Sequence, residues 1–190
     1  MWFALRLVGA LVLAIALGIG SAYLSVMSLR GTHTIQNGPW TTILESGGAN
    51  AGMYTRAFVA LVGLLALNKD ETIYYSAARD SGGAPLDGAC SYRIEGRDPD
   101  ARWWSVTLYA GDHFLIPNPA NRYSVSKSNV VRATDGTFVV RLSGAQEANN
   151  WIATSRDGFH VILRLYNPGQ TVRDEPAAAP LPAIVKEACT

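Results

Sequence analysis

Charged side chains are scarce in this sequence of 190 residues. They make up 16% of the chain, against roughly 25% in an average soluble domain, while 48% of its residues are hydrophobic. This composition excludes an intrinsically disordered chain. The formal net charge is only +1, which argues against a nucleic-acid-binding protein with a basic face. The length fits one ordinary domain and an additional segment.

Motifs of cofactor, metal and hydrolytic chemistry are also absent from the sequence. The chain has no G-x-S-x-G, H-E-x-x-H, C-x-x-C, phosphate-loop or dinucleotide-binding motif. Its three histidines, His33, His113 and His160, lack the spacing of metal ligands. Asp98 and Asp100 are spaced as at the start of a calcium loop, but the residues after them do not continue it. The sequence therefore predicts no cofactor and no metal.

One long uncharged stretch lies near the N-terminus, from Leu7 to Leu29. As a helix it is roughly 34 Å long, enough for a hydrocarbon core of about 30 Å. We expect residues 1–30 to form a retained membrane anchor; the alternative is a cleavable signal peptide with a processing site at Gly20-Ser21-Ala22. Arg6 and Arg30 flank the stretch almost symmetrically, so the charges indicate little about orientation. The short N-terminal segment before the stretch favours a cytoplasmic N-terminus. Both interpretations export the rest of the chain.

The exported part carries almost no net charge, because only two of the 16 basic residues and none of the 15 acidic residues lie in residues 1–30. It contains both cysteines, Cys90 and Cys189. An even count in an oxidising compartment predicts a disulfide. The bridge would close a loop of about 100 residues and restrict the unfolded chain by roughly 4–5 kcal/mol. The alternative is a catalytic thiol, Cys90, with His113 or His160 as its base, but nothing near Cys90 lowers a thiol pKa.

Residues 31–70 read as a tether followed by an amphipathic helix. Asn37-Gly38-Pro39 is typical of a turn. The apolar spacing predicts a helix over Ala51–Leu67, capped by Asn50 and ended by Asn68. We expect it to pack on a sheet; the alternative is that its apolar face lies on the membrane or on a partner. That face consists of Tyr54, Phe58, Leu61 and Leu65.

In residues 71–190 apolar side chains recur at every second position, which is typical of half-buried strands. Several alternating strands with turns between them predict an antiparallel β-sandwich, and the segment 175–182 predicts a Pro-rich strap that leads to Cys189. The expected strands are Thr72–Ala77, Cys90–Glu95, Trp103–Tyr109, Tyr123–Ser126, Thr137–Leu142 and Phe159–Tyr166. In the last of these, the pattern places His160, Ile162 and Arg164 opposite an apolar face.

Several short motifs resemble a known bacterial family. They are Leu86-Asp87-Gly88-Ala89-Cys90-Ser91-Tyr92, Trp103 to Tyr109, Asn118-Pro119, Arg122-Tyr123-Ser124, Asn149-Asn150-Trp151, Leu163 to Pro168 and Leu181-Pro182. Together they resemble the short, membrane-anchored members of the family called "domain of unknown function 1214", over about residues 74–189. The resemblance implies a jelly-roll-like sandwich in a bacterial envelope and a companion protein with a "domain of unknown function 1254". It implies no catalytic residues.

Aromatic and Arg side chains are the candidates for a binding cleft for a sugar, peptide or lipid head group. The alternative is that they are core aromatics and a buried Arg that ties loops together. A second hypothesis pairs Asp112 and His113 with Ser105, Ser124 or Ser126 as a hydrolase. The candidate cleft residues are Trp103, Tyr109, His113, Arg122, Tyr123, Asn150, Trp151, Arg164 and Tyr166.

The favoured interpretation is a non-enzymatic protein of the bacterial inner membrane, with one span, a cytoplasmic N-terminus and a periplasmic domain. This domain is expected to bind a partner protein, first of all the companion protein, or an envelope ligand, and not nucleic acid. The first alternative is an envelope hydrolase or carbohydrate-active enzyme with a cleft near His113, Arg122 and Arg164. The second is a structural module that forms homo-oligomers.

Overall fold

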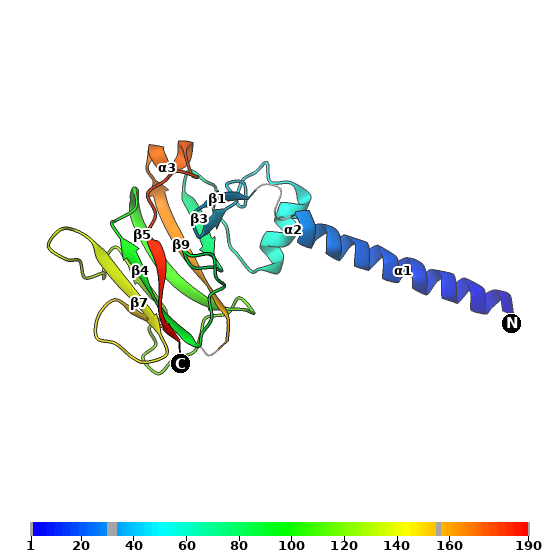
Figure 1. Cartoon of the computed structure of the whole chain (residues 1–190). Coiled ribbons are helices and arrows are strands. Elements are labelled where there is room, and N and C mark those ends of the chain that lie inside the picture. Colours follow the sequence, from blue (N-terminus) through cyan, green and yellow to red (C-terminus); the bar gives the residue numbers. More distant parts are fainter. Residues whose placement is uncertain (1, 30–33, 155–156, 190) are drawn as a thin grey trace.

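A long N-terminal helix stands clear of a body made of two β-sheets (Figure 1). The computed structural model describes residues 2–29, 34–154 and 157–189, so Met1 and Arg30 of the predicted anchor lie outside them. Helix α1 (Trp2–Leu29) is long and apolar enough to cross a membrane. Its first 18 residues are exposed, and only a few positions near its C-terminal end are partly covered.

The described part of the body contains a six-stranded and a four-stranded sheet. The larger sheet, in spatial order, consists of β1 (Ile35–Asn37), β2 (Trp40–Thr42), β3 (Thr72–Ala77), β9 (Phe159–Pro168), β5 (Ala101–Ala110) and β6 (Ser124–Ser126). The smaller sheet consists of β10 (Ala183–Cys189), β4 (Cys90–Gly96), β7 (Phe138–Ser143) and β8 (Trp151–Ala153). The strand pairs between these elements are antiparallel, except for β7 and β8, which run parallel. The prediction of a purely antiparallel sheet structure is therefore wrong at this pair.

The hydrophobic core lies between the two sheets. Trp104 of β5 stacks on Phe138 of β7 with ring centroids 4.9 Å apart, and Tyr92 of β4 meets the edge of Phe159 of β9 at 5.8 Å. Each of these four side chains is at most 5% exposed. Such aromatic pairs join the sheets face to face, because each strand turns alternate side chains inward. The predicted mainly β fold with two facing sheets is thus confirmed, and the jelly-roll likeness stays a prediction.

Several elements of the structure are not predicted by the sequence pattern. The turn at Gly38 and Pro39 joins a hairpin of β1 and β2, where a tether was expected. A short helix, α3 (Gln170–Asp174), precedes the predicted C-terminal strap at residues 175–182, and strand β10 follows it. Between them, the strap is fastened to the larger sheet: Trp40 donates its indole N–H to the Pro182 carbonyl at 2.7 Å, and the Tyr75 hydroxyl donates to the Pro176 carbonyl at 2.9 Å.

The predicted helix over Ala51–Leu67 is shorter in the structure. Helix α2 spans Met53–Leu61, its N-cap is Gly52, and none of its residues is buried. It ends early because Gly63 adopts a φ of +67°, a left-handed conformation that reverses the chain. Asn68 instead accepts hydrogen bonds from the amides of Asp70 and Glu71 in the turn before β3. The expected capping roles of Asn50 and Asn68 are therefore wrong.

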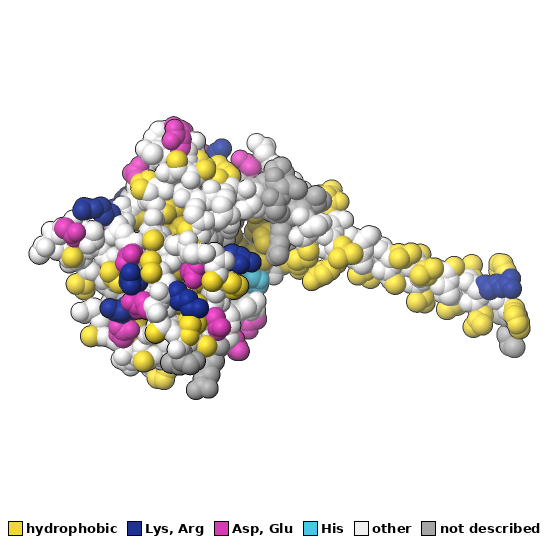
Figure 2. Space-filling model, viewed as in Figure 1, with side chains coloured by type: hydrophobic (Ala, Val, Ile, Leu, Met, Phe, Trp, Pro, Cys, Tyr) yellow, Lys and Arg dark blue, Asp and Glu magenta, His cyan; other side chains and the backbone are white. Residues whose placement is uncertain are grey.

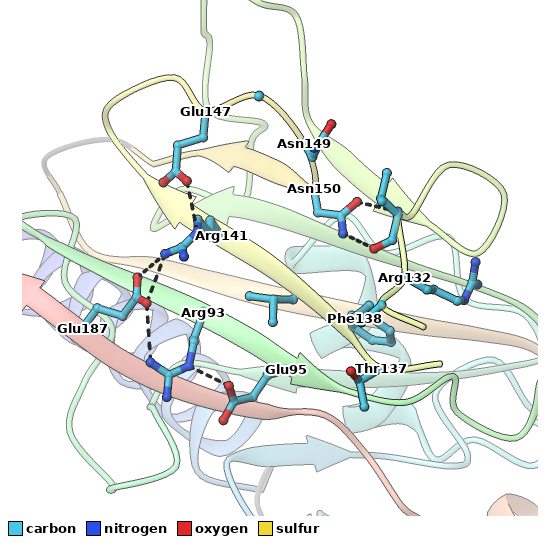
Figure 3. Close-up of a pocket in the computed structure, with 14 residues that line it drawn as sticks. Arg93, Glu95, Arg132, Thr137, Phe138, Arg141, Glu147, Asn149, Asn150 and Glu187 are labelled. Carbon is cyan, nitrogen blue, oxygen red and sulfur yellow. Dashed lines mark hydrogen bonds and ion pairs between the residues drawn. The ribbon is translucent and has the colours of Figure 1, made fainter. Parts of the chain in front are cut away.

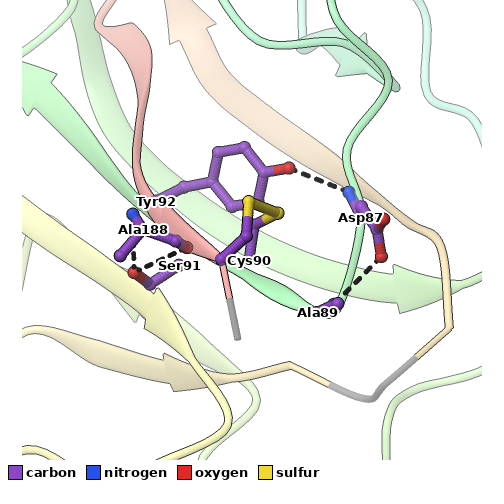
Figure 4. The surroundings of a disulfide bond; sticks show 7 residues. Asp87, Ala89, Cys90, Ser91, Tyr92 and Ala188 are labelled. Atoms are coloured by element: carbon purple, nitrogen blue, oxygen red, sulfur yellow. Dashed lines mark hydrogen bonds between the residues drawn. A yellow bond between two sulfur atoms is a disulfide. The ribbon is translucent and has the colours of Figure 1, made fainter.

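The predicted disulfide is present between Cys90, the first residue of β4, and Cys189, the last residue of β10 (Figure 4). The two cysteines are partners across this antiparallel pair of strands. Next to the bridge, Tyr92 accepts a hydrogen bond from the Asp87 amide through its hydroxyl, at 2.9 Å. The bridge therefore fixes the C-terminal end of the chain to the start of the smaller sheet.

We predict that replacing both cysteines, Cys90→Ser with Cys189→Ser, lowers the free energy of unfolding by about 2–4 kcal/mol, because the bridge closes a long loop. The measurement is urea unfolding of the full chain in detergent micelles, followed by tryptophan fluorescence. As a control, a reductant should destabilise the parent and leave the double variant unchanged. Alkylation of the unreduced parent at two thiols would contradict the bridge.

Candidate functional site

The outward face of the larger sheet carries polar and charged side chains, whereas the core-facing side is apolar. Along β9, Arg164 and His160 point away from the core, opposite fully buried Val161, Leu163 and Leu165. Strand register then places Tyr109 of β5 across from His160, and Tyr74 of β3 across from Arg164. Neighbours across a strand pair lie about 5 Å apart. The alternation of β9 therefore gathers an Arg, a His and two Tyr side chains on one patch.

Helix α2 forms a roof over this patch. A hollow of about 200 Å³ separates the sheet from the apolar side chains of Phe58, Val59, Val62 and Leu64. The chain after α2 is fixed to the sheet, because the Leu67 amide donates to the Tyr74 hydroxyl at 3.1 Å. It also passes close to Gly47, where a Cβ atom would stand only 2.0 Å from the Leu67 carbonyl oxygen. These contacts set the roof above the sheet and leave space beneath it.

Arg164 brings an unpaired positive charge to the hollow. Its guanidinium donates to the Thr107 hydroxyl at 3.1 Å and to the Tyr109 hydroxyl at 2.7 Å, and it lies 5.5 Å from the centre of the Tyr109 ring. Among the described residues, no carboxylate forms an ion pair with it. A guanidinium has five N–H donors, so donors remain for a ligand that carries negative charge.

A pair of histidines lines the same hollow. The ring of His160 stacks on that of Tyr109 with centroids 5.6 Å apart. The ring of His113 meets the His160 ring edge-on, with centroids 5.0 Å apart. Burial, and secondly the charge of His113, lower the pKa of His160 to about 4. At neutral pH His160 is therefore an uncharged imidazole, which can accept or donate a hydrogen bond but is a weak base.

The structure brings together three of the predicted cleft residues, Tyr109, His113 and Arg164, and places the other six elsewhere. Trp103 and Tyr166 form an edge-on pair at 5.3 Å, and Trp103 donates to the Ser128 hydroxyl. Trp151 is buried and donates to Ser143. The Tyr123 hydroxyl donates to Asn121, Asn150 exchanges two hydrogen bonds with the backbone of Val131, and Arg122 lines a separate hollow with Asn150. The expectation of one cleft holding all nine residues is wrong. Trp103 and Tyr166 share the outward face of the larger sheet with Tyr109 and Arg164 but lie outside the hollow, and Trp151 belongs to the smaller sheet.

The proposed Asp112–His113 unit is likewise not assembled. Asp112 accepts a hydrogen bond from the Phe114 amide at 3.0 Å and so shapes the turn after β5. His113 takes a φ of 69° in that turn, which turns its ring toward His160. Of the three candidate serines, Ser126 bonds Asn129, and none lines the hollow under α2.

A larger hollow, of about 760 Å³, lies on the outer face of the smaller sheet (Figure 3). Its charges are already paired. Arg141 contacts Glu147 and Glu187 at 3.1 Å each, and Arg93 contacts Glu95 at 2.6 Å, which raises the pKa of Arg93. Such a closed network at the surface attracts a charged ligand less than an unpaired Arg does. The smaller hollow under α2 is therefore the better candidate site.

The described residues contain no group of three or more His, Cys, Asp or Glu side chains that could hold a metal ion. Under α2, the ligating atoms are those of two imidazoles, beside a guanidinium. A positive charge next to two imidazoles disfavours a cation and favours an anion.

Comparisons with known proteins support the fold. Residues 71–170 match the family described as "Protein of unknown function (DUF1214)". The chain belongs to the DUF1214 family. The matched range contains Tyr109, His113, His160 and Arg164, whereas α2, the roof of the hollow, precedes it.

Two solved structures are similar to this DUF1214 chain. The VPA0106 protein from Vibrio parahaemolyticus matches with a TM-score of 0.60 and 23% identity, over 73% of this chain and 36% of that protein. The DUF1214 chain therefore spans about a third of its length. An uncharacterized protein from Burkholderia cenocepacia matches with a TM-score of 0.43 and 20% identity, over 63% of this chain and 29% of that protein. The Vibrio match shows the fold alone, and no curated protein matches the DUF1214 chain.

The lowered pKa of His160 makes stability depend on pH. Between pH 6.5 and about 4, the unfolded DUF1214 chain binds a proton at His160 that the folded chain does not, so stability falls as the pH falls. We predict that His160→Gln makes the fall in the free energy of unfolding smaller by about 1–2 kcal/mol. The value is less than the full pKa shift of His160 implies, because the side chain is partly exposed to solvent. The measurement is urea unfolding of both proteins at pH 7 and pH 4.5.

His113→Gln is the matched control for this comparison. Because burial is the larger cause of the shift, the His113→Gln variant should keep most of the pH dependence. Equal losses of stability in the parent and in His160→Gln would contradict a buried neutral imidazole.

Proposed function

We propose that this protein is a membrane-anchored envelope protein that binds a small ligand with an anionic group and an apolar part. Helix α1 is the anchor, and the hollow between α2 and the larger sheet is the binding site. The proposal places the N-terminus in the cytoplasm and the β domain in the periplasm, at the bacterial inner membrane. A companion protein and homo-oligomers stay predictions.

The observation that carries this proposal is the unpaired guanidinium of Arg164 beneath an apolar roof. Its two hydroxyl partners, Thr107 and Tyr109, orient the group without neutralising its charge. The roof supplies apolar side chains alone, from Phe58, Val59, Val62 and Leu64. A ligand that satisfies both surfaces has a carboxylate or phosphate at one end and a hydrocarbon at the other.

The size of the hollow limits what enters it. Pockets for drug-sized ligands measure about 300–1,000 Å³, and this one measures about 200 Å³. The site therefore accommodates a small molecule or one end of a longer one. Binding is favoured over catalysis, because His160 is a weak base at neutral pH. Arg122 of the suggested hydrolase cleft also lines a different hollow.

We predict that hexanoate binds the full chain in lipid nanodiscs more tightly than hexanol or hexylamine, because only hexanoate pairs with Arg164. The variant Arg164→Gln should weaken hexanoate binding by about tenfold or more, the size expected for losing hydrogen bonds to a charged group. The measurement is ligand-detected NMR, with empty nanodiscs as the blank.

Arg122→Gln is the control for this test, because it removes the same charge from a hollow elsewhere on the surface. Its hexanoate binding should equal that of the parent. Equal affinity of the three hexyl compounds, or unchanged binding in Arg164→Gln, would exclude the anion site.

We predict that alkaline phosphatase fused to the C-terminus is active in intact cells, because this reporter folds only outside the cytoplasm. The same fusion without residues 2–29 should be inactive, since α1 carries the export signal. The intact mass of the full fusion shows in addition whether the anchor is retained. An inactive full fusion would contradict the proposed orientation.

A further inference from the structure

Helix α2 has a second apolar side that the hollow does not use. Met53 is 76% exposed, Leu61 is 58% exposed, and Leu65, in the segment after the helix, is 91% exposed. With 3.6 residues per turn, Met53, Tyr54, Ala57 and Leu61 fall within an arc of about 100°. That arc differs from the one occupied by Phe58, Val59 and Val62, which line the hollow. Large exposed apolar surfaces of this kind mark interaction sites.

This apolar side also lacks charge. Between Ala49 and Leu67 the sole charged residue is Arg56. Its guanidinium is folded back onto the chain and donates to the carbonyls of Ala51 and Ala49 at 2.9 Å and 2.7 Å. The surface therefore has the composition of a contact with hydrocarbon, with no cluster of cations for an anionic surface.

Helix α1 indicates where this surface lies. Trp2 and Phe3 are exposed at one end of α1, and Tyr23 is exposed toward the other. Arg6 marks the inner end of the uncharged stretch, and a hydrocarbon core of about 30 Å takes up roughly 20 helical residues beyond it. The residues around Ser25 to Met27 therefore lie where the hydrocarbon meets the outer head-group layer.

Helix α2 packs against α1 at this level. The two helices are in contact, and α1 is partly covered at Ser25, Val26 and Met27 but exposed over residues 2–19. Figure 1 shows α1 leaving the body beside α2, and Figure 2 shows hydrophobic side chains along the protruding helix. The exposed apolar side of α2 therefore lies close to the outer end of the apolar helix α1.

From this contact we infer that the exposed side of α2, together with Leu61 and the following Leu65, is seated in the outer interfacial layer of the bilayer. The inference rests on the proposed anchoring by α1. It assigns α2 two contacts: lipid on one side and the Arg164 hollow on the other. The hollow then opens at the membrane surface, where amphiphilic ligands concentrate. Neutral lipid suffices for this contact, because the surface carries no cationic cluster.

The test measures the depth of single labelled positions in the full chain. Both native cysteines are bonded to each other, so an introduced thiol is the one available for a nitroxide label. The variants are Leu61→Cys and Leu65→Cys, each reconstituted in phosphatidylcholine bilayers. Collisions with oxygen, which dissolves in hydrocarbon, are compared with collisions with a water-soluble nickel chelate.

Two further positions calibrate the measurement. Leu17→Cys lies in the middle of α1, where the native side chain is 64% exposed, and reports on the anchor. Val139→Cys lies on the smaller sheet, where the native side chain is 39% exposed, and serves as the matched exposed apolar control. All four native side chains are partly or largely exposed, so labels there should leave the fold intact.

We expect oxygen collisions to dominate at Leu17, Leu61 and Leu65, and nickel collisions to dominate at Val139. Nickel dominance at Leu61 and Leu65, with oxygen dominance at Leu17, would overturn the inference and leave the anchor standing. Low collision rates with both reagents at Leu61 and Leu65 would also overturn it, because they indicate a covering protein; spin–spin broadening would identify that protein as a second copy. Nickel dominance at Leu17 would overturn the anchor and the inference together.

Discussion

Strand β9 is the constraint on which the rest of the structure depends. It pairs with β3 on one side and β5 on the other, and its core-facing residues Val161, Leu163 and Leu165 are fully buried. A slip of one residue in its register would turn Arg164 into the core and these side chains outward. Burying an unpaired guanidinium is far more costly than exposing a valine. The core therefore fixes the position of the one charge that the candidate site needs.

Much of the fold could be predicted from local sequence, because the long strands alternate strictly. Strand β3 has the predicted bounds, and β9 extends the prediction by two residues. What could not be predicted depends on distant partners. Strand β8 has three residues and exists through pairing with β7, and β10 forms on β4 beside the disulfide. Helix α2 was predicted too long, because apolar spacing continues past Gly63 while the backbone reverses there.

The candidate site was partly visible in the sequence for the same reason. Alternation in β9 placed His160 and Arg164 on one side of the strand, but His160 drew attention only as a possible base or metal ligand. Aromatic residues mislead such an analysis, since Trp151 carries a polar N–H yet is 3% exposed and bonded to Ser143 within the body. Of the roof residues, Phe58 belongs to the predicted apolar face of the helix. The hollow itself could not be predicted, because a sequence pattern cannot distinguish a helix that packs tightly on a sheet from one that spans a hollow.

The floor and the roof of the hollow differ in stability. The floor of the hollow is the outward face of the larger sheet, whose other face packs in the core. Its backbone therefore moves only if the β domain unfolds. The roof has no buried residue and is joined to the sheet at few points, such as the hydrogen bond from Leu67 to Tyr74. Because elements with few buried contacts open at low free energy, α2 is displaced more easily than the sheet beneath it. Under the proposed function, the contact that α2 makes on its other side therefore bears on how readily Arg164 is reached.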